Sequence, residues 1–248
     1  MKKRVSLLDL LRGVAIVYMM VYHLCFDLKY MFGVGLPDWL PPAVAATFVP
    51  NMVVWWILFG VSGICSGYSS NLLRRGAVLY LVGWLLTAGT AVVSPQMPIV
   101  FGVLSCFGAC MVLTALCSKV LDKIPWWILV SVAAVLWYMF RHIHVDRTID
   151  LFVSEYTIPH LNTGLLYPIG LPAANFVSMD YFPVLPYLFI FWAGRGLYRP
   201  VSKGNLPQWI YRSHCRPLEW IGSHSLLVYA LHQPVFIGVL MLIFSLLK

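Results

Sequence analysis

Charged side chains are scarce in this sequence, at 10% of its 248 residues, and only nine residues are acidic. A soluble globular domain carries about 25% charged residues, which keep its surface hydrated. Hydrophobic residues instead make up 60% of this chain. The composition excludes an ordinary soluble domain and predicts an integral membrane protein whose helices are solvated by lipid.

Several patterns that would indicate other kinds of protein are also missing. The six cysteines predict no disulfide framework, because most fall inside apolar segments and behave there as small buried hydrophobic residues. His142 and His144 have no further ligands at a recognised spacing, so we expect no metal site. The net charge of +8 is spread over short clusters between apolar runs, which argues against a nucleic-acid partner. The sequence has no internal repeat, whereas transporters built from duplicated halves usually show one.

Seven apolar segments are the main feature that the sequence does contain. A membrane span needs roughly 20 apolar residues, and Pro-rich or polar stretches separate these segments. We predict the all-α class, as one domain over residues 1–248 that forms a polytopic membrane helix bundle of about seven transmembrane helices. The predicted helices cover residues 7–30, 44–68, 77–93, 99–117, 125–140, 181–197 and 219–247.

The distribution of positive charge predicts how the bundle is oriented. Cytosolic loops of membrane proteins are enriched in lysine and arginine. If the N-terminus is cytosolic, the opposite side holds little more than Lys29, Arg141, Arg147 and Lys248. We therefore expect a multi-pass protein of the cytoplasmic (plasma) membrane with its N-terminus in the cytosol. The predicted cytosolic segments contain Lys2, Lys3, Arg4, Arg74, Arg75, Lys119, Lys123, Arg199, Lys203, Arg212 and Arg216.

The first predicted helix contains four ionisable residues: Asp9, Arg12, His23 and Asp27. At about 100° per residue, Arg12 and His23 share one face and lie about 16 Å apart along the axis. Asp27 lies one turn beyond His23, within reach to hold its imidazole. Ionisable groups in a membrane are costly unless partnered, so this stripe predicts a functional site. The alternative is structural: Arg12 pairs with Asp9, and His23 pairs with Asp27.

The last predicted helix also carries a polar face. Ser225, Tyr229 and His232 are spaced i, i+4 and i+7, which places them on one side of the helix. Pro234 lacks an N–H and leaves the carbonyl of Ala230 without its helical partner. A kinked helix with a histidine at the kink suits the wall of a pocket. Hydrogen bonding between buried helices would explain the same residues, and the sequence leaves both interpretations open.

A short polar segment precedes the third predicted helix. Asn71, Arg74 and Arg75 lie there on the predicted cytosolic side and could receive an anionic phosphate. The two arginines could equally be ordinary positive-inside residues that contact lipid head groups, and composition does not separate these alternatives.

The second predicted helix contains Gly60, Ser62, Gly63 and Gly67. Small residues at such spacing are typical of closely packed membrane helices, and we favour that interpretation. The alternative is an intramembrane serine protease with Ser62 as nucleophile and His232 as base. A Gly-x-Ser-Gly match arises easily by chance in a glycine-rich membrane helix, so this alternative receives little weight.

Taken in order, these segments resemble the heparan-alpha-glucosaminide N-acetyltransferase-like family, the bacterial branch of the transmembrane acyltransferase superfamily. The resemblance covers nearly the whole chain and rests on the order and spacing of several motifs. One departure is Ser105, where many relatives carry a histidine after the Phe-Gly-x-Leu segment. The motifs are Leu8-Asp9 with Arg12-Gly13-Val14-Ala15-Ile16 and His23, then Phe59 to Gly63, Ser70-Asn71-Leu72-Leu73-Arg74-Arg75-Gly76, Phe101-Gly102-Val103-Leu104, Asp180-Tyr181-Phe182-Pro183-Val184-Leu185-Pro186, and Ile221-Gly222-Ser223-His224-Ser225-Leu226-Leu227-Val228-Tyr229-Ala230-Leu231-His232-Gln233-Pro234.

The resemblance implies an acyltransferase that moves an acyl group from cytosolic acyl-CoA, acetyl-CoA or another, to a hydroxyl or amine of an extracytoplasmic glycan or related acceptor. By the pattern of the family, His23 would be the general base and Asp27 its orienting group. Arg12 would line the CoA channel, and His232 would help to close the site. The cytosolic arginines beside Asn71 would meet the nucleotide phosphates.

The main alternative is a small-molecule or lipid transporter or flippase without chemistry, in which the same polar stripe is a permeation path. The missing duplication argues against it. The expected partners are acyl-CoA, an extracytoplasmic sugar or amine acceptor and membrane lipid, with no nucleic acid. The sequence leaves a homodimer open.

Overall fold

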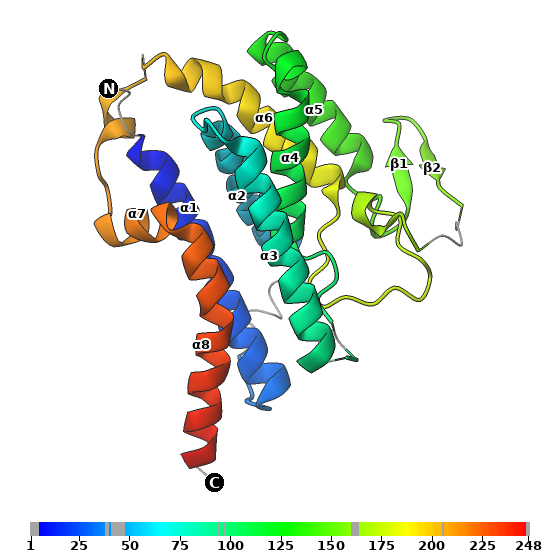
Figure 1. The fold of residues 1–248 in the computed structure, drawn as a ribbon, viewed down its shortest axis with the longest axis vertical. Coiled ribbons are helices and arrows are strands. Elements are labelled where there is room, and N and C mark those ends of the chain that lie inside the picture. The colour runs from blue at the N-terminus through cyan, green and yellow to red at the C-terminus, as the bar shows by residue number, and fades with distance from the viewer. Residues whose placement is uncertain are drawn as a thin grey trace. The chain divides into compact units, whose positions relative to one another are not determined.

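The computed structural model describes residues 5–37, 40, 48–93, 95–96, 98–159, 164–204 and 206–246. Within these ranges the protein is mostly helical, with eight α-helices and one two-stranded sheet (Figure 1), which confirms the all-α class. The helices are α1 (Ser6–Phe26), α2 (Phe48–Ser66), α3 (Leu72–Val93), α4 (Val103–Leu121), α5 (Trp126–Phe140), α6 (Val184–Ser202), α7 (Arg216–Ser223) and α8 (Ser225–Leu246), with strands β1 (Thr148–Asp150) and β2 (Glu155–Thr157) and the short turns η1 (Asp27–Met31, π-helical), η3 (Tyr167–Ile169) and η4 (Gln208–Tyr211).

Four helical segments in the described part of the chain are long and apolar enough to cross a membrane. They are Ser6–Met31, which joins α1 to η1, and the helices α3, α4 and α8. Shorter apolar helices cover Met52–Ser66 and α5. The sequence predicted about seven spans, and length and composition support four. The predicted start of the second helix, at residue 44, lies outside the described residues.

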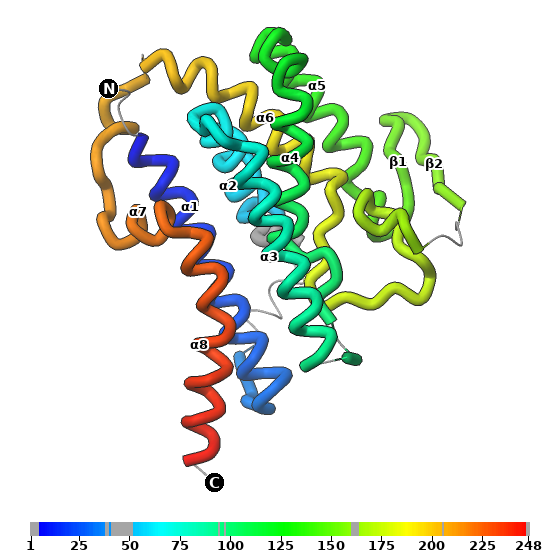
Figure 2. Tube along the Cα trace, in the orientation of Figure 1, coloured from blue at the N-terminus to red at the C-terminus, as the bar shows by residue number. Residues whose placement is uncertain are grey.

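The chain divides into two compact units. The first consists of Met1–Val61 and Gly204–Lys248, and the second of Ser62–Lys203. Figure 2 traces the first unit through the blue N-terminal segment and the orange and red C-terminal segment. The expectation of one domain over residues 1–248 stays a prediction.

In the first unit, α1 and α8 run in the same direction (Figure 1). The rings of His23 and His232 have centroids 5.1 Å apart. Further along both segments, Phe32 stacks on Phe244 with centroids 4.7 Å apart. Residue numbers rise together along the two segments, so α1 and α8 begin at the same end of the unit.

The short helix α7 lies directly against the backbone of α1. A Cβ atom on Gly13 would lie 2.7 Å from the carbonyl carbon of Leu218 and would overlap its oxygen. A Cβ atom on Gly222 would lie 2.8 Å from the carbonyl carbon of Asp9. Only glycine permits this approach, because any side chain at either position would separate the helices. The glycine of the Arg-Gly motif is therefore a packing residue.

The sequence predicted one final helix over residues 219–247, and this boundary is wrong at its start. The structure has two helices, α7 and α8, with a break at His224. Glu219 accepts hydrogen bonds from the backbone N–H groups of His214 and Cys215, at 2.7 and 3.3 Å, which fixes the start of α7. The break lies within the run Gly222-Ser223-His224-Ser225, which has no large apolar side chain, and the prediction carried one helix through this run.

In the second unit, α3 and α4 pack through small residues. A Cβ atom on Gly83 would lie 2.7 Å from the backbone nitrogen of Ser105. One on Gly108 would lie 2.5 Å from the backbone nitrogen of Tyr80. Such close approach is typical of helices in lipid, where van der Waals packing drives association.

The polar segment between α5 and α6 contains a hairpin that the sequence did not predict. β1 and β2 are antiparallel, with Thr148 opposite Thr157 and Asp150 opposite Glu155. The carboxylate of Asp150 lies 3.0 Å from the guanidinium of Arg141. Each strand has only three residues, which is too short for a pattern of alternating polarity to be recognised.

Two segments that are distant in sequence meet at the start of α4. The backbone N–H of Phe182 donates to the carbonyl of Phe101 at 3.0 Å. The N–H of Val103 donates to the carboxylate of Asp180 at 3.2 Å. Burial raises the pKa of Asp180 to about 6. Asp180 therefore caps α4 from another part of the chain, and joins two of the segments on which the family resemblance rests.

Candidate active site

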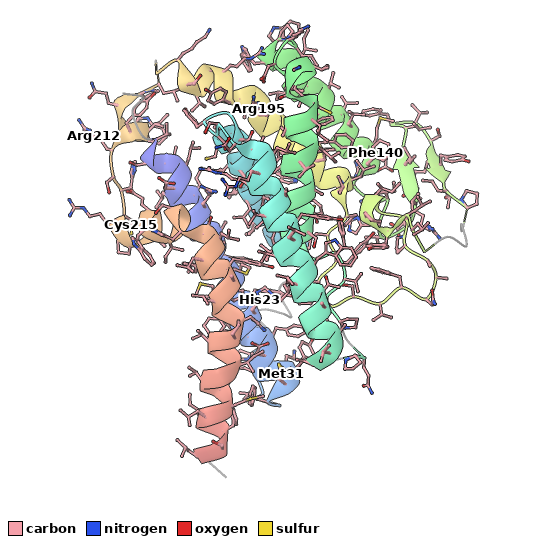
Figure 3. The ribbon with its side chains drawn as sticks, in the orientation of Figure 1. His23, Met31, Phe140, Arg195, Arg212 and Cys215 are labelled. Atoms are coloured by element: carbon pink, nitrogen blue, oxygen red, sulfur yellow. The ribbon has the colours of Figure 1, made fainter. Side chains whose placement is uncertain are left out.

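Two imidazoles lie side by side in the first unit. His23 projects from α1 and His232 from α8, with ring planes inclined at 59° (Figure 3 labels His23). His232 is buried, with 7% of its surface exposed. The structure therefore brings together the two histidines that the sequence assigned to catalysis.

Both imidazoles are held by carbonyl groups of their own helices. Nδ1 of His23 lies 3.0 Å from the carbonyl oxygen of Met19, and Nδ1 of His232 lies 2.6 Å from that of Tyr229. A carbonyl oxygen can only accept, so each Nδ1 carries the hydrogen. In the neutral rings, Nε2 then carries the lone pair. Each histidine consequently presents a basic nitrogen on the side away from its own backbone.

Asp27 is almost completely buried, with 1% of its surface exposed. It is the first residue of η1, where α1 changes from α-helical to π-helical bonding. Single π-helical turns within helices are frequent at functional sites. The side-chain nitrogen of Gln233 donates to both carboxylate oxygens of Asp27, at 3.0 and 3.1 Å. Asp27 is thereby fixed to α8, next to His232.

The prediction that Asp27 orients His23 stays a prediction. Nδ1 of His23 bonds to the carbonyl of Met19, and the carboxylate of Asp27 accepts hydrogen bonds from the side-chain nitrogen of Gln233. Spacing of i and i+4 places two side chains near each other but does not decide which acceptor the ring nitrogen takes. Sequence reasoning missed Gln233 because it considered ionisable groups, although the residue stands between His232 and Pro234 in the closing motif.

Arg12 lies on α1 beside Gly13, at the level where α7 packs. Because α1 is continuous from Ser6 to Phe26, Arg12 and His23 stay about 16 Å apart along one face. The structure therefore does not bring these two side chains into contact. The arginine side chain is half-buried.

The remaining residues predicted to bind the cofactor belong to the second unit. Asn71, Arg74 and Arg75 are exposed at the start of α3. The N–H of Arg75 donates to the carbonyl of Asn71 at 3.1 Å, which closes the first turn of the helix. A helix N-terminus and two guanidinium groups form an electropositive surface that suits a phosphate.

The close-packing interpretation of the second helix is confirmed for its last turns. A Cβ atom on Gly63 would lie 2.9 Å from the carbonyl carbon of Phe191 in α6, and Gly67 lies against the ring of Tyr198.

His142 and His144 lie in the segment after α5. His142 is 3.7 Å from the carboxylate of Asp150. Burial lowers the pKa of His144 to about 4, which keeps its ring neutral. Over the described ranges, no group of three or more potential metal ligands is found.

Comparison with known proteins decides the family. Residues 4–234 match the model of the heparan-alpha-glucosaminide N-acetyltransferase catalytic domain. The chain belongs to this family. The match includes His23, Asp27, His232 and Gln233, and ends at Pro234. No curated protein and no solved structure matches the chain.

Membership of the N-acetyltransferase family identifies the chain as a transmembrane acetyltransferase-type domain. It also confirms the family resemblance seen in the sequence. The apolar helices and the family together make the chain a membrane protein.

Proposed function

We propose that the protein transfers an acyl group, acetyl in the first instance, from cytosolic acyl-CoA to a hydroxyl or amine of an extracytoplasmic glycan or related acceptor. The observation that carries the proposal is the pair of imidazoles, His23 and His232, beside the buried carboxylate of Asp27. In a family of acetyltransferases, a basic ring nitrogen next to a fixed carboxylate is the arrangement that acyl transfer requires.

His23 is assigned as the general base. As the acceptor oxygen or nitrogen attacks the thioester carbonyl, Nε2 of His23 removes the acceptor proton. The new C–O or C–N bond forms, the C–S bond breaks, and the proton passes to the departing thiolate to give the CoA thiol. General base catalysis of this kind contributes about 10²–10⁴-fold.

Asp27 and His232 support this step. The imidazolium that forms on His23 is stabilised by the negative charge of Asp27, one helical turn away, since charge interactions are strong where water is excluded. The second basic nitrogen, on His232, binds and orients the acceptor group. The two histidines thus divide proton removal and acceptor positioning between them.

The donor is assigned to the cytosolic side. Arg12 would line the channel for the acyl-CoA arm, and Asn71, Arg74 and Arg75 would bind its phosphates through charge-assisted hydrogen bonds. With a cytosolic N-terminus, His23 lies about 26 Å along the helix from Ser6, close to the far side of a hydrocarbon core about 30 Å thick. This position suits an extracytoplasmic acceptor.

The parallel course of α1 and α8 supports the proposed topology. Two parallel spans cross the membrane in the same direction, so the stretch from α1 to α8 makes an odd number of crossings. The four long apolar segments alone would give an even number of crossings. An odd number of the helices α2, α5 and α6 must then cross as well, and all three together give seven spans. We place this bundle in the plasma membrane, surrounded by lipid, and a homodimer is compatible with it.

The proposal is tested with the purified full chain reconstituted in liposomes. Transfer of labelled acetyl from acetyl-CoA and release of the CoA thiol are measured for the wild type and for His23→Ala, alongside acetyl-CoA binding. We expect transfer to fall by about 10²–10⁴-fold while binding is retained. His214→Ala, an exposed histidine in the segment before α7, is the matched control.

Transfer by His23→Ala at the wild-type rate would rule out His23 as the base. Movement of an acceptor through the liposome membrane with no acyl donor present would favour the transporter alternative.

A further inference from the structure

The side-chain amide of Gln233 has a hydrogen-bonded nitrogen and an oxygen without a hydrogen-bond partner among the described residues. Its side-chain nitrogen donates to both oxygens of Asp27. Its side-chain oxygen is buried and has no hydrogen-bond partner among the described residues. Buried polar atoms are nearly always hydrogen-bonded, so an open one requires a specific explanation.

The orientation of this amide is determined by chemistry. An ionised carboxylate is an acceptor only, so the NH₂ group of Gln233 must face Asp27. The reversed amide would place one acceptor against another. The open atom of Gln233 is therefore the carbonyl oxygen Oε1, an acceptor.

The neighbouring residue presents a second open acceptor. Nε2 of His232 is buried and likewise has no hydrogen-bond partner in the described part of the chain. Because Nδ1 of the same ring faces the carbonyl of Tyr229, Nε2 carries a lone pair. Two buried acceptors on consecutive residues thus face α1, where the ring of His232 lies beside that of His23 and the amide of Gln233 lies against Asp27.

Such a group of acceptors selects the ligand that can satisfy it. A carboxylate or phosphate group brings only acceptors and would be repelled. A single hydroxyl has one hydrogen and leaves one of the two atoms unpaired. Two neighbouring donors, as in a 1,2-diol or a 1,2-amino alcohol, can satisfy both. Sites built to hydrogen-bond a substrate group reject analogues that lack it, because the buried partner is then left unpaired.

We infer that Gln233 is a positioning and specificity-determining residue. It fixes Asp27 through its NH₂ group and, with His232, forms an acceptor pair that selects acyl acceptors with two adjacent hydrogen-bond donors. This assignment rests on the proposed function, because the ligand that it describes is the acyl acceptor of the same site.

A purely structural role makes a different prediction. If Gln233 only satisfied the buried carboxylate of Asp27, its replacement would lower stability and activity without changing the preference between acceptors. The preference between a diol and the matching mono-alcohol is therefore the property to measure.

The experiment uses the full chain in detergent with two probes on the same carbon ring, cis-1,2-cyclohexanediol and cyclohexanol. Their binding is measured calorimetrically, and transfer is measured as release of the CoA thiol from acetyl-CoA. In the wild type we expect the diol to be preferred by about tenfold or more. Gln233→Met, which keeps the length and removes both polar atoms, should bring the ratio close to one. Gln208→Met makes the same change at an exposed glutamine and should leave the ratio unchanged.

Gln233→Glu provides a second variant in case the methionine variant does not fold. Glutamate keeps an acceptor oxygen, so the preference for the diol should persist. Opposed carboxylates must share a proton, so binding and transfer should strengthen as the pH is lowered, and the preference for the diol should persist at each pH, whereas a purely structural role predicts no preference at any pH. The rings of His23 and His232 lie beside each other near this amide, and the wild-type profile serves as the reference for their titration.

The outcomes separate the inference from the proposed function. Preferential diol binding that Gln233→Met abolishes supports the inference even if no acetyl is transferred, in which case the proposed function fails alone. Equal binding of both probes by the wild type, no binding of either, or a preference that survives in Gln233→Met would overturn the inference.

Discussion

Replacing Gly222 with alanine tests the contact between α7 and α1. The added Cβ atom would lie 2.8 Å from the carbonyl carbon of Asp9 and 2.8 Å from the backbone nitrogen of Gly13. Non-bonded carbon atoms are most stable at about 3.5–4.0 Å. The atoms that it meets belong to the backbone and cannot rotate away as a side chain would. The two helices must therefore separate by about 1 Å.

The expected cost follows from two opposing effects. Forcing an extra methyl group into a packed interior costs about 1–3 kcal/mol, and rigid neighbours place this site at the upper end. Alanine is a better helix former than glycine by about 1 kcal/mol, which offsets part of the loss. We expect a net loss of about 2 kcal/mol for Gly222→Ala. Gly13→Ala should lower the stability by a similar amount, because its Cβ would lie 2.7 Å from the carbonyl carbon of Leu218.

The assay is thermal unfolding of the purified full chain, with every variant in the same detergent. Gly238→Ala is the matched control, because nothing lies within 4 Å of a Cβ atom at that helical position in α8. The control should unfold at or slightly above the wild-type temperature. A loss of about 2 kcal/mol lowers the midpoint by about 4–8 °C in a chain of this size. A Gly222→Ala midpoint equal to that of Gly238→Ala would refute the close backbone contact.

Two further predictions concern the second unit. Ser105→His should destabilise the protein by several kcal/mol in chemical unfolding, because the backbone of Ser105 lies against Gly83 and leaves no room for an imidazole; unfolding at the wild-type denaturant concentration would contradict this packing. Asp180→Asn should remove a pH dependence of stability. Burial raises the pKa of Asp180 from 3.8 to about 6, so the folded protein holds a proton that the unfolded chain has lost, and stability falls as the pH rises from about 4 to 6 by at most about 3 kcal/mol. If the unfolding midpoint changes between pH 4.5 and pH 7 by the same amount in the wild type and in Asp180→Asn, this assignment is wrong.

The features that the sequence predicted well are those that depend on a long apolar pattern. The first helix was expected over residues 7–30, and the structure gives a candidate span over Ser6–Met31. The last helix was expected through residue 247, and α8 is described to Leu246. Both have many consecutive residues that must be apolar in lipid, so composition alone locates them.

The features that the sequence could not predict depend on single backbone contacts. The break at His224 lies in the run Gly222-Ser223-His224-Ser225, and Gly222 packs on α1 there; an isolated glycine is tolerated within a helix, so this run does not by itself predict a break. The sequence predicted that His23 and His232 belong to one site, but it did not predict that their rings are neighbours. Their separation depends on how α8 lies along α1, which no pattern within either helix contains.

The hydrogen-bond partner of Asp27 likewise could not be predicted from the sequence. Helical spacing placed it near His23, but both groups had other partners available. The imidazole of His23 hydrogen-bonds to the carbonyl of Met19 in its own helix. The carboxylate of Asp27 accepts hydrogen bonds from the amide of Gln233 in α8. A choice between partners that are all within reach depends on side-chain direction, and spacing along one helix does not contain it.

Packing contacts on either side of the imidazole pair hold α8 in place along α1. Gly222 holds the C-terminal segment to α1 before the histidines, and Phe32 with Phe244 holds it beyond them. An imidazole lies about 5–6 Å from its helix axis, so a rotation of α8 by about 30° would move it by about 3 Å. A displacement of about 1 Å can already cost about 10²-fold in rate. In the proposed mechanism, the glycines of the Arg-Gly and Ile-Gly segments would therefore affect acyl transfer through the placement of α8, although each lies ten residues from the histidine of its own segment.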